Sequence, residues 1–445
     1  MPFRFAPNAE YPYAAGSLFL GTDPAKGFEV GIRTERHALT IAGARSGKGA
    51  ALIIPNLLRW PENALVIDPK GEAAEQTAEA RAAMGQEVHI LAPFADVPHY
   101  RLPAHLDRFR AQLNPLADID PAALDAREDV NVIADGLMMR HDPRSGFWDG
   151  GAASVISGVI AHQLSTAPAE LRTLPEMRRI MTLPQKDFGA FVDAMSLNRA
   201  CGNLPAAGAS KLQNTGTEAG HFISNVHANT NWLDSPAMDA MLSESSNGFR
   251  LADLKTKPCT VYLVLPPDLI AEHSRFLRLF VRMALRAMAK GGTGGRRCLF
   301  MLDEFYSLGH IDEIAKAAGA MPGYGVSLWP VLQDLGQLEA LYGREMMHSF
   351  FGNADAHIFF GNTDAMSLGY LSDRMGVTGI EEVGSAPIHV QGRPMTGQTA
   401  AALFSSGGHP AAKQGAAIIG GAVGIVGAGL HTLEQAIQQH QANDY

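Results

Sequence analysis

The apolar residues of this chain fall into short continuous runs that alternate with segments of helical spacing, in two separate blocks. The first block predicts a strand over 38–42, a helix from Lys48, a strand over 64–68, a helix over 71–84 and a strand over 87–91. Strands that alternate with helices in this way are typical of parallel βαβ units.

The second block begins at Thr260 and repeats the same alternation. It predicts a strand from Thr260, a helix over 274–290, a glycine-rich turn over 291–295, a strand over 298–302, a helix over 311–320, a strand over 326–332, a helix from Leu335, a strand over 357–360 and a helix over 364–375. Between the blocks, about 114–247, apolar positions follow helical spacing, as in 128–139. The pattern therefore predicts an α/β fold with a parallel central sheet and an inserted all-α domain.

Composition sets limits on function without assigning one. The chain has 445 residues, 46% of them hydrophobic, and a formal net charge of −9, so DNA contact would need a local basic patch or a surface lining a ring. The cysteines Cys201, Cys259 and Cys298 lack metal-like spacing, which favours buried free thiols and a reducing cytoplasm. The N-terminus lacks an apolar signal core, and no run reaches the roughly 20 apolar residues of a spanning helix.

The segment between the first predicted strand and helix has the composition of a phosphate-binding loop. It reads Ile-Ala-Gly-Ala-Arg-Ser-Gly-Lys-Gly over 41–49. Glycines let backbone N–H groups converge on phosphate oxygens, a lysine reaches the terminal phosphates, and the start of a helix favours anions. Two positions depart from the standard pattern, because Ala42 replaces its first glycine and Gly49 replaces the Ser or Thr that contacts Mg²⁺. A glycine turn with one exposed lysine is the alternative interpretation.

We expect this loop to bind ATP with Mg²⁺. The expected phosphate-binding residues are Gly43, Ala44, Arg45, Ser46, Gly47, Lys48, Gly49 and Ala50.

Two further strand ends carry the expected catalytic groups. An apolar strand over 298–302 ends in Asp303 and Glu304. Asp303 suits a Mg²⁺ partner, directly or through water, and Glu304 suits the base that polarises the attacking water. The next strand ends in Gln333, whose amide would sense the terminal phosphate, although a strand-end hydrogen bond is an equally good interpretation. With Lys48, Glu304 and Gln333 form the expected catalytic set, and Asp303 is the expected metal ligand.

Taken together, these motifs and their order resemble the coupling-protein ATPases of type IV secretion and conjugation. The resemblance covers about 29–376 and includes Arg-Ser-Gly-Lys-Gly (45–49), Ile-Ile-Pro-Asn-Leu (53–57), Val-Ile-Asp-Pro-Lys-Gly-Glu (66–72), Asn-Pro-Leu (114–116), Phe-Trp-Asp (147–149), Asp-Glu-Phe (303–305), Gln-Asp (333–334) with Gln-Leu (337–338), and 353–374. A glycine after the loop lysine is common in that family.

The resemblance implies a RecA-like P-loop NTPase fold and a homo-hexamer with ATP between subunits. Its expected domains are 1–113, the N-terminal half of the nucleotide-binding domain; 114–250, an inserted all-α domain; 251–385, the C-terminal half; and 386–445, an irregular glycine-rich tail. The implied partners are secretion-channel components, a relaxase–DNA complex or effector proteins, and single-stranded DNA. The implied location is the cytoplasmic face of the bacterial inner membrane.

Three features depart from that family. Relatives usually begin with two spanning helices, and we expect here a form without them, whether natural, truncated or half of a split system. Some relatives carry an arginine before the sensor strand, where this chain has Met-Pro-Gly-Tyr-Gly (321–325). Arg344 or Arg374 is a possible substitute, with a solvated arginine as the alternative. The glycine-rich run 415–430 is compatible with a flexible tail, a membrane or partner-helix contact, or a buried helix.

Other positions leave the nature of the substrate open. Lys70 lies in a turn and either reaches the nucleotide or serves only the turn. In the middle domain, Lys211, His221, His227 and Trp232 are weak candidates for DNA contact. A cytoplasmic DNA-pumping ATPase and a slow nucleotide-dependent effector adaptor remain alternatives to the coupling ATPase.

Overall fold

The computed structural model describes residues 11–23, 27–139, 146–213, 217–243, 249–311, 313–314 and 320–375, with the backbone of four short strands beyond them. Its central element is a seven-stranded sheet of order β5-β6-β4-β7-β8-β3-β9. The pairs that β3 makes with β8 and β9, and that β6 makes with β4 and β5, are parallel. The predicted α/β class with a parallel central sheet is therefore confirmed.

Contacts group the chain into two compact units, of which the first contains residues 1–61, 300–306 and 327–445. Its elements are β1 (Leu18–Thr22), β2 (Glu29–Ile32), β3 (His37–Ala42), a π-helical turn (Gly49–Ile53), α1 (Ile54–Leu57), β8 (Val326–Leu332, from its second residue), α13 (Leu335–Asn353), β9 (Ala354–Phe360) and α14 (Ala365–Met375). Every residue of β3 and β8 is buried, as expected of strands covered on both faces. The antiparallel β1–β2 pair was not predicted.

The second unit contains residues 62–299 and 307–326. Its α/β part comprises β4 (Asn63–Ile67), α2 (Glu72–Ala83), β5 (Glu87–Leu91), α10 (Asp253–Thr256), β6 (Cys259–Leu263) and α11 (Ile270–Lys290). The strand β7 (Cys298–Leu302) begins in this unit and ends in the first. Cys259 and Cys298 are fully buried free thiols within β6 and β7. The predicted helix over 311–320 lies largely outside the described residues.

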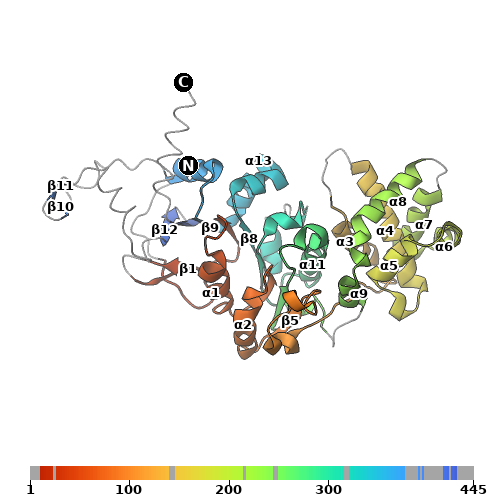
Figure 1. The fold of residues 1–445 in the computed structure, drawn as a ribbon, viewed down its shortest axis with the longest axis horizontal. Helices are drawn as coiled ribbons and strands as arrows, with labels where there is room; N and C mark the ends of the chain where they lie inside the picture. The colour runs from red at the N-terminus through yellow and green to blue at the C-terminus, as the bar shows by residue number, and fades with distance from the viewer. Residues whose placement is uncertain are drawn as a thin grey trace, which may run out of the picture. The chain divides into compact units, whose positions relative to one another are not determined.

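A group of helices separates β5 from β6 along the chain. They are α3 (Ala126–Leu137), α4 (Gly146–Thr166), α5 (Leu174–Met181), α6 (Gln185–Leu197), α7 (Ala200–Gln213), α8 (Thr217–Thr230) and α9 (Pro236–Ser243), and Figure 1 shows α4 to α8 gathered together. A Cβ added at Gly158 of α4 would lie 2.9 Å from Gly208 Cα of α7. The two helices therefore depend on glycine for their close crossing.

The remaining strands lie toward the C-terminus. They are β10 (His389–Val390), β11 (Arg393–Pro394), β12 (Gln414–Ile419) and β13 (Ala422–Gly427). The last two pair antiparallel within the glycine-rich run 415–430, so these residues are extended rather than helical. The rest of the predicted tail, 386–445, lies outside the described residues. Among those that are described, no helix combines the length and apolar character needed to cross a bilayer.

Candidate active site

The expected phosphate loop follows β3, which lies between β8 and β9 in the sheet. Two buried side chains fix β3 against β8: His37 Nδ1 accepts a hydrogen bond from Leu328 N at 3.0 Å, and Thr40 Oγ1 accepts one from Trp329 Nε1 at 2.8 Å. On the other side, β9 pairs with β3 as far as Ala42 and Phe360. The start of the loop is thus held by two strands from the C-terminal part of the chain.

Close backbone packing determines the path of the loop. A Cβ at Gly43 would lie 2.0 Å from the carbonyl oxygen of Gly361, and a Cβ at Gly361 would lie 2.7 Å from Ser46 Cβ. Gly47 has a φ of 85° and Arg45 a φ of 58°, both in the left-handed region. Glycine is therefore required at 43 and 361 for space and suits 47 for conformation. The backbone of Arg45 is strained in this conformation, as that of non-glycine residues in functional loops often is.

The loop leads into a helix through Lys48. The chain turns through Gly49–Ile53 as a π-helical turn and continues as α1. Asn56 of α1 anchors this helix to β1, because its side chain exchanges two 2.8 Å hydrogen bonds with the backbone of Phe19. The first amides of a helix lack partners within it, and its dipole favours an anion at that end. The predicted anion-binding geometry, a glycine-rich loop ahead of a helix start, is thus present.

The expected catalytic carboxylates lie beside the loop lysine. Lys48 Nζ is 2.8 Å from Asp303 Oδ1 and 3.3 Å from Glu304 Oε1. Asp303 Oδ1 also accepts a hydrogen bond from the Glu304 amide at 3.0 Å. Glu304 has a φ of 52°, a left-handed conformation that costs a non-glycine residue roughly 1–2 kcal/mol. This turn aims two consecutive carboxylates at one ammonium group.

Burial and charge act in opposite directions on this pair. The Asp303 and Lys48 side chains are only 16% and 18% exposed. Burial raises the pKa of Asp303 and the nearby Glu304 adds to the rise, while Lys48 opposes both. Burial alone would lower the pKa of Lys48, but the two carboxylates outweigh it, so this pKa is raised. The lysine is therefore a cation, and it favours the anionic form of Asp303.

Gln333 completes the group at the end of β8. Its Nε2 lies 3.4 Å from Glu304 Oε2, and its backbone N–H donates to Gln337 Oε1 at 3.0 Å. Asp334 caps α13 by accepting a hydrogen bond from the Gln337 amide at 2.9 Å, so Gln333 lies on a fixed turn. The structure thus brings Lys48, Asp303, Glu304 and Gln333 together.

The residues present fit a nucleotide with Mg²⁺. Lys48 and the helix start supply positive charge, and the loop leaves a fully buried hydroxyl oxygen, Ser46 Oγ, without a partner among the described residues. The adjacent carboxylates Asp303 and Glu304 are oxygen donors of the kind that Mg²⁺ prefers. A side chain at Gly49 would meet no described atom within 4 Å, so this position has room beside the loop.

One residue of the site was missed. Asn362, two positions beyond the end of β9, is 6% exposed, and its Nδ2 lies 3.5 Å from the carbonyl oxygen of Gln333. The sequence signal was available, because a polar amide follows an apolar strand here just as Gln333 follows β8. It identifies a site residue only once β9 is known to lie beside β3.

Among the arginines considered, Arg344 is exposed and follows Gly343, where a φ of 74° interrupts α13. The Arg374 guanidinium instead lies over the Tyr370 ring, 5.2 Å from its centre. Lys70 is 66% exposed and lies 3.9 Å from Glu72 within its own turn.

The weak DNA candidates of the middle domain differ in exposure. Trp232 is 1% exposed, so the suggestion that it stacks on DNA was wrong. His227 contacts Arg178 at 2.8 Å, and His221 contacts the Trp148 ring. Phe147 and Trp148 are 59% and 37% exposed, respectively.

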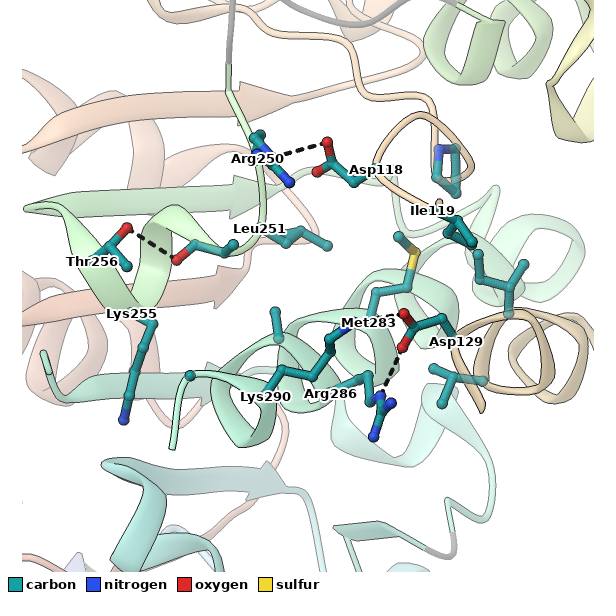
Figure 2. A pocket seen from close by; sticks show the side chains of 16 residues that line it. Asp118, Ile119, Asp129, Arg250, Leu251, Lys255, Thr256, Met283, Arg286 and Lys290 are labelled. Atoms are coloured by element: carbon teal, nitrogen blue, oxygen red, sulfur yellow. Dashed lines mark hydrogen bonds and ion pairs between the residues drawn. The ribbon is translucent and has the colours of Figure 1, made fainter. Parts of the chain in front are cut away.

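The second unit also contains a pocket of about 330 Å³ between α3, α10 and α11. Its charged groups pair with one another: Arg250 with Asp118 at 2.9 Å, and Arg286 and Lys290 with Asp129 at 2.8 and 2.7 Å (Figure 2). Ile119, Val132 and Met283 are among its apolar lining residues. The two ion pairs of Asp129 join α3 to α11, and the pocket holds none of the expected catalytic residues.

Comparison with known families decides the relationship. The model of the family described as "Type IV secretory system Conjugative DNA transfer" matches residues 6–400. The chain belongs to this conjugative DNA transfer family. The resemblance inferred from the phosphate loop, the carboxylate pair and their order is therefore confirmed.

Curated relatives include other proteins of conjugation. The chain is 28% identical over 324 residues to conjugal transfer protein TraG of Escherichia coli, covering 68% of this chain and 49% of the relative. It is 25% identical over 313 residues to protein VirD4 of Rhizobium radiobacter, covering 69% and 43%. This member of the conjugative DNA transfer family thus spans about half the length of the curated relatives it matches.

Solved structures support the fold. The bacterial conjugative coupling protein TrwBdeltaN70 in a sulphate complex superposes with a TM-score of 0.60 at 16% identity, covering 84% of this chain and 83% of that one. TrwB with a non-hydrolysable ATP analogue gives 0.58 at 15% identity, covering 82% and 78%. The RecA-like P-loop NTPase fold expected of a family member is confirmed.

Proposed function

We propose that this chain binds and hydrolyses ATP with Mg²⁺ at the loop 43–50. The convergence of Lys48, Asp303, Glu304 and Gln333 at the ends of β3, β7 and β8 carries the proposal. These groups arise from three separated parts of the sequence, and a turn without function would not require them to meet. TrwB, which shares the fold, has been solved with an ATP analogue and with ADP and Mg²⁺, which supports the same ligands here.

Each residue has a role that follows from its position. The amides of Gly43 to Ala50 hold the phosphates, and Lys48 exchanges part of its pairing with the carboxylates for the terminal phosphates. Asp303 would hold Mg²⁺ directly or through water, and that ion would supply positive charge beside the phosphate oxygens. Glu304 accepts a proton from the attacking water. Gln333, whose amide contacts Glu304, orients that water.

The process that ATP hydrolysis drives is proposed from membership of the family. We infer a coupling protein that recruits a relaxase–DNA complex or effector proteins and passes them to a type IV secretion channel at the cytoplasmic face of the inner membrane. The helices α3 to α9, placed between the halves of the nucleotide fold, support a motor with a separate substrate-binding part. Single-stranded DNA is the first substrate to test.

A homo-hexamer with ATP between subunits is part of this proposal. In phosphoryl-transfer sites an arginine from the same or a neighbouring subunit stabilises transition-state charge, and we propose that the neighbouring subunit supplies it here. Arg344 fits this role better than Arg374, because Arg344 is exposed beyond the kink at Gly343 and Arg374 lies on Tyr370. Arg344→Ala is expected to abolish hydrolysis while leaving ATP binding intact.

The direct test measures ATP turnover with and without single-stranded DNA. Wild type is expected to hydrolyse ATP, and Lys48→Ala to lose both turnover and nucleotide affinity. Lys186→Ala, which removes an exposed lysine of α6, serves as the matched control. If wild type shows no turnover under any DNA or oligomer condition, the motor is excluded and a slow adaptor is favoured. Stimulation by duplex DNA alone would favour a DNA pump.

A further inference from the structure

Asn362 places an amide across the start of the phosphate loop. It follows β9, and its Nδ2 reaches the carbonyl oxygen of Gln333 at the end of β8, 3.5 Å away, although β3 lies between these strands. The residue is more than nine-tenths buried. Its other polar atom, Oδ1, is fully buried and has no hydrogen-bond partner within the described part of the chain. A buried acceptor of this kind is costly and rarely left unpaired.

A complementary group lies on the facing loop. Ser46 Oγ is also fully buried, also lacks a partner among the described residues, and carries a proton to donate. Asn362 directly follows Gly361, the residue whose added Cβ would be 2.7 Å from Ser46 Cβ. An orphaned donor and an orphaned acceptor thus occur on two segments that touch. A hydrogen bond between the two would satisfy both groups at once.

We propose that Asn362 is a positioning residue that ties the phosphate loop to Gln333. When the loop closes on phosphate, the Ser46 hydroxyl donates a hydrogen bond to Asn362 Oδ1. Asn362 Nδ2 continues to donate to the carbonyl oxygen of Gln333. This arrangement transmits the position of the loop to the residue that orients water. Asn362 itself contacts neither nucleotide nor water. The inference rests on the proposed ATPase function.

The experiment compares Asn362→Leu, Ser46→Ala and the double variant with wild type. Leucine keeps the branched shape and the number of side-chain heavy atoms of asparagine and removes both polar atoms. ATP turnover and the affinity for a fluorescent ATP analogue are measured for each. Asn362→Leu is expected to lower kcat about tenfold and to weaken binding about threefold, a loss typical of one coupled hydrogen bond. Thr363→Ala, at the exposed next position, is the control.

Non-additivity distinguishes positioning from a general loss of structure. If Ser46 and Asn362 act as a pair, the double variant is no slower than the slower single variant. If Asn362 acts through Gln333, adding Asn362→Leu to Gln333→Ala lowers kcat no further. The inference would be overturned if the losses in kcat multiplied in either double variant, or if Asn362→Leu kept the kcat of wild type. The proposed ATPase function would stand in both cases. A wild type that neither binds nor hydrolyses ATP would overturn the proposed function, and the inference with it.

Discussion

The ammonium group of Lys48 lies 2.8 Å from the carboxylate of Asp303, so the phosphate-loop lysine and the expected Mg²⁺ partner neutralise each other. Without Lys48, Asp303 would lose its closest cation in a largely buried site, whereas Lys48 without Asp303 would retain only the more distant Glu304. A nucleotide with Mg²⁺ brings both a polyanion for the lysine and a cation for the carboxylate. The ion pair can therefore be exchanged for two new pairs without leaving a buried charge alone.

Removing one member of this pair should destabilise the protein more than removing both. Lys48→Met leaves Asp303 without its closest cation and is expected to lower the free energy of unfolding by about 1–3 kcal/mol. Adding Asp303→Asn should restore at least half of that loss. Denaturant unfolding without nucleotide at neutral pH measures both effects. A loss in the double variant equal to the sum of the two single losses would show that the two charges are not coupled.

The contact between Gly43 and Gly361 should tolerate no side chain. Gly43→Ala would place a Cβ 2.0 Å from the Gly361 carbonyl oxygen, so the loop must move away from β9. We expect ATP-analogue affinity to fall at least about tenfold, because the loop amides would no longer converge on one phosphate. Gly352→Ala in α13, where an added Cβ meets no described atom within 4 Å, is the matched control. Retained affinity in Gly43→Ala would show that the loop is not the binding element.

Gly49 offers a gain-of-contact test of the metal site. A Cβ there meets no described atom within 4 Å, so Gly49→Thr fits and supplies the hydroxyl that the standard loop directs at Mg²⁺. The Mg²⁺ concentration giving half-maximal turnover is expected to fall about threefold to tenfold, as for one added metal contact. Gly49→Val, of similar shape without the hydroxyl, controls for the added bulk. An unchanged Mg²⁺ dependence would mean that the missing hydroxyl is no handicap.

Acid stability should depend on His273 of α11. Burial lowers the pKa of its imidazole below the usual 6.5, with Glu272 opposing; the ring lies against Phe94, and Nδ1 is buried without a partner among the described residues. The unfolded chain therefore protonates His273 more readily than the folded chain does. The stability that the neutral imidazole contributes is fully present above pH 6.5. It is lost as pH falls from 6.5 through the lowered folded pKa.

His273→Phe should therefore flatten the pH dependence of unfolding just below pH 6.5. The slopes of the two proteins are expected to differ by at most about 1.4 kcal/mol per pH unit, the value for one proton. Denaturant unfolding at intervals from pH 5 to 8, roughly the range over which histidine titrates, measures both curves. Parallel curves would show that His273 is protonated equally in the folded and unfolded states.

Local sequence was sufficient for the strands and for the residues at their ends. The predicted bounds of β5, β7 and β8 match the structure, because buried parallel strands are continuous apolar runs between polar turns. Lys48, Asp303 and Gln333 were recognisable because the chemistry of a phosphate site restricts which residues follow such strands. Their meeting confirms that parallel strands bring their carboxyl ends to one edge.

What escaped prediction depends on contacts between distant segments. Asn362 belongs to the site only because β9 pairs with β3, and the orphaned Oδ1 appears only with the packing of Gly361 on the loop. Trp232 looks like an exposed stacking residue until the surrounding helices bury it. The β1–β2 pair was also missed, and its role in the site appears only in the structure, where the backbone of Phe19 in β1 holds Asn56 of α1.

The sheet order also determines when the site can exist during synthesis. The phosphate loop leaves the ribosome early, but both strands that flank β3 are translated late; the buried bond from Leu328 to His37 joins residues 291 positions apart. Until β8 and β9 emerge, no strand flanks the loop and both edges of β3 are unpaired. A nascent chain interrupted before β8 would thus carry the whole phosphate-loop motif without the strands that flank it, and both unpaired edges of β3 would favour aggregation.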